Sequence, residues 1–169
     1  MSLIETGDIQ TYYEIHGQGP PLLMINGYGD HTGHWFRMLP WLIKSFELVI
    51  YDNRGAGRSD APNIPYTMKM LAGDAVSLMD SLGIAKANIF GISMGGMVAQ
   101  ELALNYPKKV DHLVLGCTIS GGINTVYPEA EVLGYRSSST SMGRYTSWQQ
   151  PKQMGTNCGK ATVPLLAQN

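Results

Sequence analysis

The sequence predicts an α/β fold, in which a parallel, doubly wound sheet has helices packed on both faces. Short unbroken runs of apolar residues, typical of strands buried on both faces, recur along the chain. Longer segments with apolar residues at helical spacing lie between these runs. Glycine-rich or polar turns separate the two kinds of segment. Strands that alternate with helices in this way form parallel sheets with right-handed connections.

The first part of the chain contains three predicted strands and one predicted helix. Residues 9–15 alternate between apolar and polar side chains, which indicates a half-exposed strand. Residues 22–25 and 48–51 are unbroken apolar runs and predict buried strands. The apolar residues of the segment between them have helical spacing: Trp35, Met38, Leu39 and Leu42. Pro40 is expected to bend or split that helix.

The next part of the chain continues the alternation. A helix is predicted over residues 71–82, with Gly83 at its C-terminal end. Residues 88–92 form the next predicted strand, and residues 97–106 form a helix that the following proline ends. The last recognisable strand is residues 113–115. The predicted sheet is therefore truncated after this strand.

The C-terminal fifth differs in charge from the rest. Residues 1–133 contain 8 basic and 13 acidic residues, whereas residues 134–169 contain 4 basic residues and no acidic one. We therefore predict one incomplete α/β core over residues 1–133 and an irregular, polar, basic tail over residues 134–169. Two origins of this tail remain open: a flexible polar extension, or unrelated sequence such as that of a shifted reading frame.

Composition limits the possible partners. The formal net charge is −1, so nothing indicates a nucleic acid or an anionic membrane surface as partner. No apolar run is long enough to span a membrane, and the N-terminus lacks the features of a signal peptide. Cys117 and Cys158 are too few for a disulfide framework and have no metal-ligand spacing. We expect a soluble cytoplasmic protein without a metal or cofactor.

The segment Gly91-Ile92-Ser93-Met94-Gly95 fits the pattern G-x-S-x-G. It follows a predicted buried strand and begins a predicted helix, which is the context of a nucleophile elbow. A sharp turn there places the serine hydroxyl above the sheet, at a helix N-terminus that favours a developing negative charge. The competing interpretation is a glycine-rich turn with an idle serine. The strand–turn–helix context favours Ser93 as the nucleophile.

The loop after the first buried strand has the features of an oxyanion hole. Residues 26–29 contain two glycines, which permit close approach of the backbone to a substrate oxygen. The expected donors are the backbone N–H groups of Tyr28 and Met94. Taken alone, this loop is equally consistent with an ordinary turn.

Three stretches of the chain resemble the N-terminal part of the α/β-hydrolases: residues 22–29 with Trp35 downstream, residues 51–60, and residues 90–96. The resemblance is to the branch of esterases, oxoadipate enol-lactonases and cofactor-free haloperoxidases. It implies a serine hydrolase by ancestry, which cleaves a small carboxylic ester or lactone through an acyl-Ser93 intermediate without a cofactor. This family usually has histidine where the chain has Asn26, but a backbone donor does not depend on that side chain. The family's last strands and its cap domain are not recognisable here.

Asp52 and its neighbours belong to a loop that is architectural in this family. A buried Asp52 needs a cationic partner, and both Arg54 and Arg58 are close in sequence. The family order places the triad acid after the nucleophile, so Asp52 is not expected to be that acid.

The sequence offers no evident base for Ser93. His112 is the sole histidine after Ser93, and it stands at the start of a strand rather than at the catalytic end. His31 and His34 could approach from an unusual side, but they fit exposed positions at a helix start better. Glu129 and Glu131 follow the last strand, where some relatives place the acid. A serine without a base is a poor nucleophile, so we expect impaired catalysis.

The alternative function is a truncated, non-catalytic protein that binds small acyl compounds or another chain. Nothing after residues 113–115 is expected to pair with that strand, so its edge is also predicted to cause self-association through residues 113–118.

Overall fold

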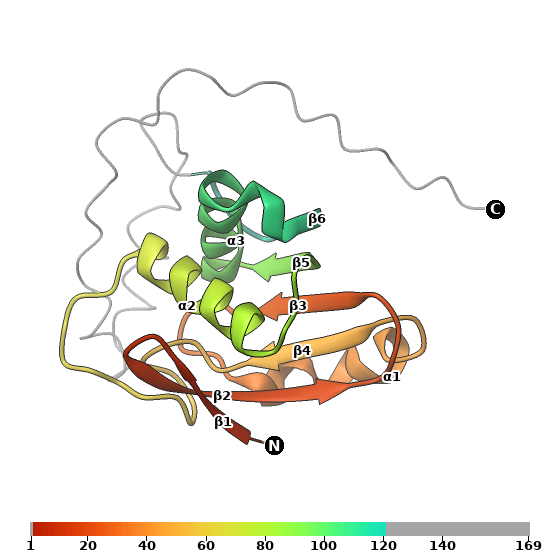
Figure 1. Ribbon diagram of the computed structural model, residues 1–169, viewed down its shortest axis with the longest axis horizontal. Helices are drawn as coiled ribbons and strands as arrows, with labels where there is room; N and C mark the ends of the chain where they lie inside the picture. The colour runs from red at the N-terminus through yellow and green to blue at the C-terminus, as the bar shows by residue number, and fades with distance from the viewer. Residues whose placement is uncertain (1, 121–169) are drawn as a thin grey trace, which may run out of the picture.

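The computed structural model describes residues 2–120, which form one mixed sheet with helices on both faces (Figure 1). The strands are β1 (Ser2–Thr6), β2 (Ile9–His16), β3 (Pro21–Ile25), β4 (Glu47–Tyr51), β5 (Ala87–Ile92) and β6 (Val110–Gly116). The helices are η1 (Thr32–Arg37), α1 (Leu39–Leu42), α2 (Met68–Ser81), α3 (Met94–Asn105) and η2 (Pro107–Lys109). The strand order across the sheet is β1-β2-β4-β3-β5-β6.

The predicted α/β class is confirmed, and the sheet is parallel from β4 through β3 and β5 to β6. Its other end departs from the expected all-parallel arrangement, since β2 pairs antiparallel with both β1 and β4. The sequence analysis assigned no structure to β1. It is joined to β2 by the two-residue turn Gly7–Asp8, in which Gly7 has a φ of 68°. So short a connection can join only antiparallel neighbours.

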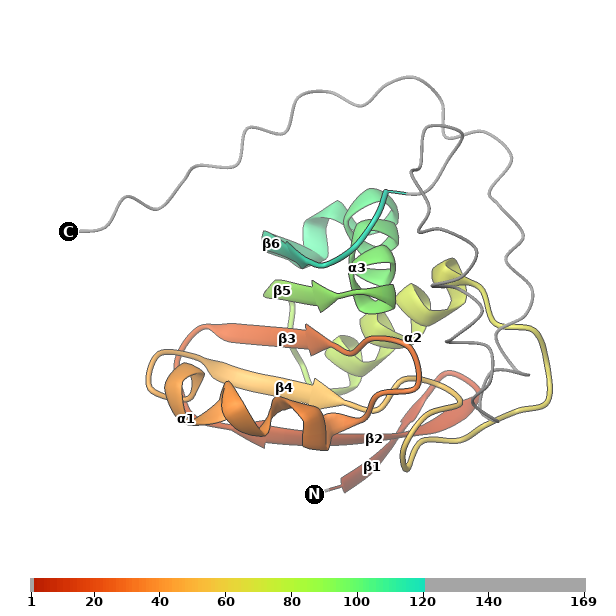
Figure 2. The same ribbon diagram turned by 180° about the vertical axis from the view of Figure 1, so that it is seen from behind.

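Two apolar clusters hold the helices to opposite faces of the sheet. On one face, Leu23, Val49 and Ile89 belong to the cluster that contains the inward sides of α2 and α3. On the other face, Leu22 and Leu48 pack around Trp35 of η1. Figure 1 shows α2 in front of the sheet, and Figure 2, the reverse view, shows α1 in front. Neighbouring residues of β3 and β4 thus point to opposite buried faces, as their unbroken apolar runs predict.

The helices follow the sequence pattern, with small differences at their ends. η1 ends at Arg37 and α1 begins at Leu39, with Pro40 in the first turn of α1, so the proline does split the predicted helix. Gly83 follows α2 with a φ of 71°, the left-handed conformation of a helix C-terminal stop. α3 begins at Met94, directly after Ser93 and three residues earlier than its apolar spacing indicates.

β6 forms an edge of the sheet within residues 2–120. Its side chains Val114 and Leu115 are 54% and 41% exposed, in keeping with the predicted uncovered edge. The predicted tail, Glu129, Glu131 and Cys158 lie outside the described residues. No helix in the described part of the chain is long and apolar enough to cross a membrane.

Candidate active site

Ser93 stands on the sharp turn between β5 and α3, with φ 55° and ψ −121°. A left-handed φ is costly for a residue with a side chain and persists only where the surroundings enforce it. Here the Ser93 N–H donates to the Gly116 carbonyl (2.9 Å). The Ser93 carbonyl accepts from the Gly96 N–H (3.0 Å) and from the Thr118 hydroxyl (2.7 Å). Both backbone groups of the strained residue are thereby fixed.

The two glycines of the motif allow strand and helix to pass close to each other. A Cβ at Gly95 would collide with the carbonyl oxygen of Ile25 at the end of β3. A Cβ at Gly91 would collide with the carbonyl oxygen of Gly95 itself. These are backbone atoms of β3 and α3 and cannot move aside cheaply. Both positions therefore require glycine for the turn to form.

The loop after β3 lies against this turn. Asn26 is 1% exposed, its side-chain N–H donates to the Tyr51 carbonyl (3.1 Å), and its own carbonyl accepts from the Asn53 amide (3.2 Å). These bonds hold the loop at the end of β4. A Cβ at Gly27 would lie 3.4 Å from the Ser93 Cβ, so Gly27 faces the serine. The structure thus brings the predicted oxyanion loop and the predicted nucleophile together.

Ser93 is a half-buried residue, and its hydroxyl caps no N–H of α3. Within residues 2–120 it has no hydrogen-bond partner. Met94 follows it as the first residue of α3 and is 5% exposed. The first N–H groups of a helix lack partners inside the helix, so the Met94 N–H is suited to bind an anion. The roles of Met94 and of the half-buried Tyr28 as oxyanion donors stay predictions.

The first and last histidines of the sequence are engaged elsewhere. His16 on β2 pairs with Glu14 through a 2.9 Å contact between Nε2 and a carboxylate oxygen. His112 is the third residue of β6, where its Nδ1 contacts Asn88 Oδ1 at 2.9 Å. Asn88 lies near the start of β5, whereas Ser93 follows its end. The expectation that His112 stands away from the catalytic end is therefore confirmed.

The other two histidines are exposed at the start of η1, as predicted. The His31 Nδ1 accepts the N–H of Gly33 (3.1 Å) and caps the helix. His34 pairs through its Nδ1 with Asp30 Oδ1 at 2.8 Å.

Residues 20–162 match the family model described as the alpha/beta hydrolase fold. The chain belongs to the α/β-hydrolase fold family. The six-stranded sheet and the elbow at Ser93 agree with the predicted N-terminal portion of that fold.

The matches to individual relatives cover only part of the length of each relative. RutD of Azorhizobium caulinodans is 35% identical over 109 residues, which are 64% of this chain and 41% of the relative. The 3-oxoadipate enol-lactonase 2 of Acinetobacter baylyi is 32% identical over 113 residues, or 66% and 42% of the two chains. The crystal structure of the enol-lactonase from Burkholderia xenovorans LB400 superposes with a TM-score of 0.65 at 34% identity, covering 66% of this chain and 45% of that one. The chain thus spans about two fifths of the length of the curated relatives it matches.

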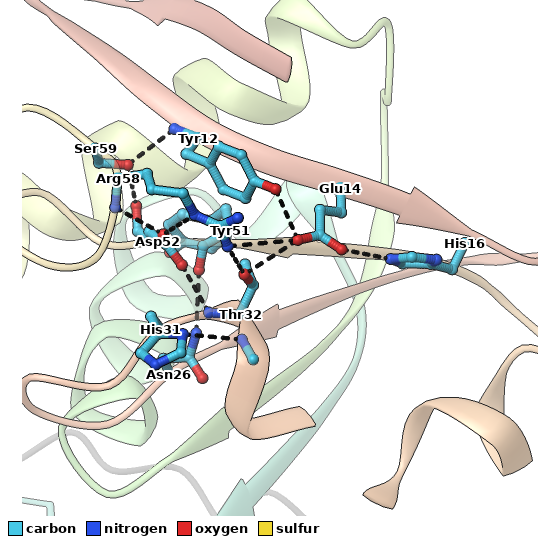
Figure 3. Close-up of polar contacts among 11 residues, drawn as sticks. Tyr12, Glu14, His16, Asn26, His31, Thr32, Tyr51, Asp52, Arg58 and Ser59 are labelled. Carbon is cyan, nitrogen blue, oxygen red and sulfur yellow. Dashed lines mark hydrogen bonds and ion pairs between the residues drawn. The ribbon is translucent and has the colours of Figure 1, made fainter. Parts of the chain in front are cut away.

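In this α/β-hydrolase, Asp52 is completely buried and is held by its own loop (Figure 3). Its carboxylate accepts from the backbone N–H groups of Thr32 (2.6 Å) and Arg58 (2.9 Å), and from the Arg58 Nε at 3.4 Å. Of the two predicted cationic partners, the structure therefore selects Arg58. The Ser59 hydroxyl donates to the Asp52 carbonyl and accepts from the Tyr12 N–H, which ties the loop to β2. These contacts support the architectural interpretation of Asp52.

Arg54 has partners that the sequence analysis did not propose. It is 3% exposed and forms paired hydrogen bonds with Asp74 of α2 (2.7 and 2.8 Å) and with Asp8 of the first turn (2.5 and 3.1 Å). The bonds from Arg54 hold the pKa of Asp8 below its ordinary value. No local sequence signal identifies these partners, which come from 46 residues before and 20 residues after the arginine.

A hollow of about 560 Å³ opens beside the loop that contains Asp52 and Arg58, and Ser93 is not among its lining residues. Glu14 and Arg58 line its polar side, and Phe36 and Leu39 its apolar side. Glu14 already contacts Tyr12, His16 and Thr32, so its carboxylate has few sites left for a ligand.

Two residues near the candidate active site, Thr118 and Asp30, were not predicted from the sequence, because no motif marks them.

Proposed function

We propose that this chain is a serine hydrolase of small carboxylic esters or lactones and that Ser93 forms the acyl intermediate. The observation that supports it most directly is the strained Ser93 turn, which lies against the Gly27 loop and whose hydroxyl has no described hydrogen-bond partner. A structural serine at a helix N-terminus would be expected to cap it, and this one does not.

The proposed step begins when the Ser93 Oγ attacks the acyl carbon of the substrate. The carbonyl oxygen becomes an oxyanion beside the N–H groups of Tyr28 and Met94, and the positive end of α3 favours that charge. The Oγ–H bond of Ser93 breaks as the Oγ bonds to the acyl carbon, and its proton passes to the leaving oxygen when the intermediate collapses, so that the acyl group stays on Ser93. An ester releases its alcohol, whereas in a lactone the new hydroxyl stays attached to the acyl group. Water then hydrolyses the acyl enzyme.

The substrate class is inferred from the relatives. Two of the proteins similar to this chain are named as enol-lactonases. A lactone is an internal ester, so the same nucleophile and oxyanion donors serve both substrates. We extend this chemistry to the present chain as the expected substrate class.

A second candidate is a non-catalytic protein that binds small acyl compounds or another chain. It is favoured by His112, the sole histidine after Ser93, which lies on the wrong part of β6 to act as a base. We therefore expect the 169-residue chain to acylate Ser93 slowly.

The test is acyl-enzyme trapping with p-nitrophenyl acetate. The protein is mixed with excess ester and quenched in acid, and its intact mass is measured. We expect one added acetyl group that maps to the peptide containing Ser93 and is absent in Ser93→Ala. Acetylation that persists in Ser93→Ala, or an unchanged mass of the unmodified protein, would favour the non-catalytic candidate.

A further inference from the structure

The backbone of Ser93 is held by the segment at the end of β6, which follows it in sequence by more than twenty residues. The Ser93 N–H donates to the Gly116 carbonyl (2.9 Å), and the Thr118 hydroxyl donates to the Ser93 carbonyl (2.7 Å). Cys117, which lies between these two partners, has a φ of 48°, a left-handed conformation that is uncommon for a residue with a side chain. The end of β6 therefore binds both backbone groups of the candidate nucleophile.

Thr118 is itself held in place. The side-chain amide of Gln100 in α3 donates to the carbonyls of Ile119 (3.0 Å) and Gly96 (3.1 Å), which ties the residue after Thr118 to the first turn of the helix. A Cβ at Gly96 would lie 2.5 Å from the Thr118 Cβ, so the half-buried Thr118 side chain lies close against that turn. A side chain confined in this way loses little further freedom when its hydroxyl donates to the Ser93 carbonyl.

The carbonyl that Thr118 binds belongs to the same peptide group as the Met94 N–H. In a planar trans peptide the carbonyl and the N–H point in opposite directions, so fixing the Ser93 carbonyl also fixes the direction of the Met94 N–H. A hydrogen bond accepted by the carbonyl polarises the peptide group and strengthens its N–H as a donor. The Gly96 N–H donates to this carbonyl as well, at 3.0 Å. The peptide group between Ser93 and Met94 is thus oriented and polarised from its carbonyl side.

We propose that Thr118 is a positioning residue for the oxyanion donor, because its hydroxyl sets the direction and the donor strength of the Met94 N–H through the Ser93 carbonyl. This inference rests on the proposed function, in which that N–H receives the oxyanion formed when Ser93 is acylated. Thr118 acts through the peptide group and makes no bond to the substrate. Loss of its hydroxyl should therefore slow acylation more than it weakens binding of the ester.

The experiment measures acylation of the complete 169-residue chain by p-nitrophenyl acetate. The first release of p-nitrophenolate over a range of ester concentrations gives the acylation rate constant and the apparent affinity for the ester. We expect Thr118→Val to lower the rate constant by roughly threefold to tenfold with little change in affinity, since one neutral hydrogen bond is lost. Thr118→Ala should behave in the same way. Thr118→Ser keeps the hydroxyl and should stay within about twofold of the unmodified protein.

Thr6→Val is the matched control. The Thr6 hydroxyl is hydrogen-bonded to the Thr11 hydroxyl at 2.5 Å, and β1, which contains Thr6, lies at the opposite edge of the sheet from β6. This variant loses a buried hydroxyl contact and some stability, but its acylation rate should be unchanged. Circular dichroism verifies that each variant is folded.

A spectroscopic readout separates positioning from a merely structural role. Hydrogen bonds from oxyanion donors lower the stretching frequency of an acyl carbonyl, which infrared difference spectra of an isotope-labelled acetyl group on Ser93 can measure. Thr118→Val should move this band to higher frequency, because the Met94 N–H becomes a weaker and less well-aimed donor. Thr6→Val should leave the band where it is.

Equal acylation rates and equal carbonyl frequencies in Thr118→Val and the unmodified protein would overturn this inference and leave the proposed function intact. A loss in Thr118→Ser as large as that in Thr118→Val would also overturn it, because packing and not the hydroxyl would then be responsible. If the unmodified protein is not acetylated on Ser93, the proposed function fails and the inference fails with it.

Discussion

Ser93 and Gly95 illustrate how single residues make the elbow. The left-handed backbone of Ser93 is tolerated because Gly116, Gly96 and Thr118 hold its N–H and carbonyl. Gly95 contributes by having no side chain where α3 crosses the end of β3. The strain needed to present the hydroxyl is therefore offset by hydrogen bonds and by close backbone packing.

At this scale the first prediction concerns Gly95. Gly95→Ala should lower the free energy of unfolding by about 3 kcal/mol or more, because the new methyl collides with the Ile25 carbonyl. Gly95→Val should have a larger effect. The matched control is Gly73→Ala within α2, where nothing lies within 4 Å and stability should rise by about 0.5–1 kcal/mol. Urea unfolding of the three variants provides the measurement, and an unchanged stability of Gly95→Val would refute the close-packed elbow.

Among the elements, the loop between β4 and α2 is fixed in part by charged and polar contacts to β2 and η1. Arg58 lies over the Tyr12 ring on β2, with its guanidinium carbon 3.4 Å from the ring centroid. Its Nη2 donates to the hydroxyl of Thr32 in η1 at 2.6 Å. Glu14 contacts the same hydroxyl at 3.3 Å (Figure 3). This network joins β2, η1 and the loop, and it should respond to pH through Glu14.

The second prediction is the pH dependence of Glu14. Burial alone would raise the pKa of Glu14, but hydrogen bonds from His16, Tyr12 and Thr32 outweigh it and lower the pKa below its ordinary value. A lowered pKa in the folded state gives stability that is present above the unfolded pKa and lost as the pH falls through the folded one.

Glu14→Gln should therefore cost about 1 kcal/mol at neutral pH, and the difference from the unmodified protein should shrink toward zero at an acidic pH below the folded-state pKa of Glu14. Urea unfolding at the two pH values measures both differences. Asp60→Asn serves as the control, because Asp60 is exposed and accepts one backbone hydrogen bond outside this network. An equal difference for Glu14→Gln at both pH values would contradict the assigned pKa shift.

For the whole molecule, the notable feature is an unpaired sheet edge in the described residues. β6 is bordered by β5 on one side only, and Val114 is 54% exposed. An apolar edge strand is a template for pairing with another chain. The third prediction is that the isolated protein self-associates through residues 113–118.

Val114→Lys should shift the protein toward the monomer, measured by light scattering over a range of concentrations, with little change in stability because the position is exposed. Val98→Lys, at a completely buried position of α3, is the contrasting variant and should prevent folding. A monodisperse monomer at high concentration, with amides 113–118 strongly protected from hydrogen exchange, would show that the edge is covered and the prediction wrong.

The fourth prediction also belongs to the whole chain. Steady-state hydrolysis of short p-nitrophenyl esters by the 169 residues alone should be slow, because the Ser93 hydroxyl has no hydrogen-bonded base among residues 2–120. The assay compares the unmodified protein with Ser93→Ala. Rapid turnover that disappears in Ser93→Ala would refute the expected impairment and still support Ser93 as the nucleophile.

The sequence by itself determined the class of the fold and the position of the elbow. Runs such as residues 22–25 and the helical spacing of α2 depend on which side chains avoid water, a property that each segment expresses locally. The G-x-S-x-G pattern is likewise recognisable within five residues, although the contact that requires Gly95, with the Ile25 carbonyl, is a tertiary one. These features could be predicted because each is confined to a few neighbouring residues.

The tertiary structure alone decided which distant groups meet. Pairing of β2 with β4, the choice of Asp74 and Asp8 by Arg54, and the position of Asp30 beside Gly27 and Ser93 are all of this kind. Arg54 had a nearer aspartate in sequence, Asp52, yet its guanidinium reaches α2 and the first turn instead. Such partners depend on where the loops between packed strands and helices lie, and these positions are set only when the elements assemble on the sheet.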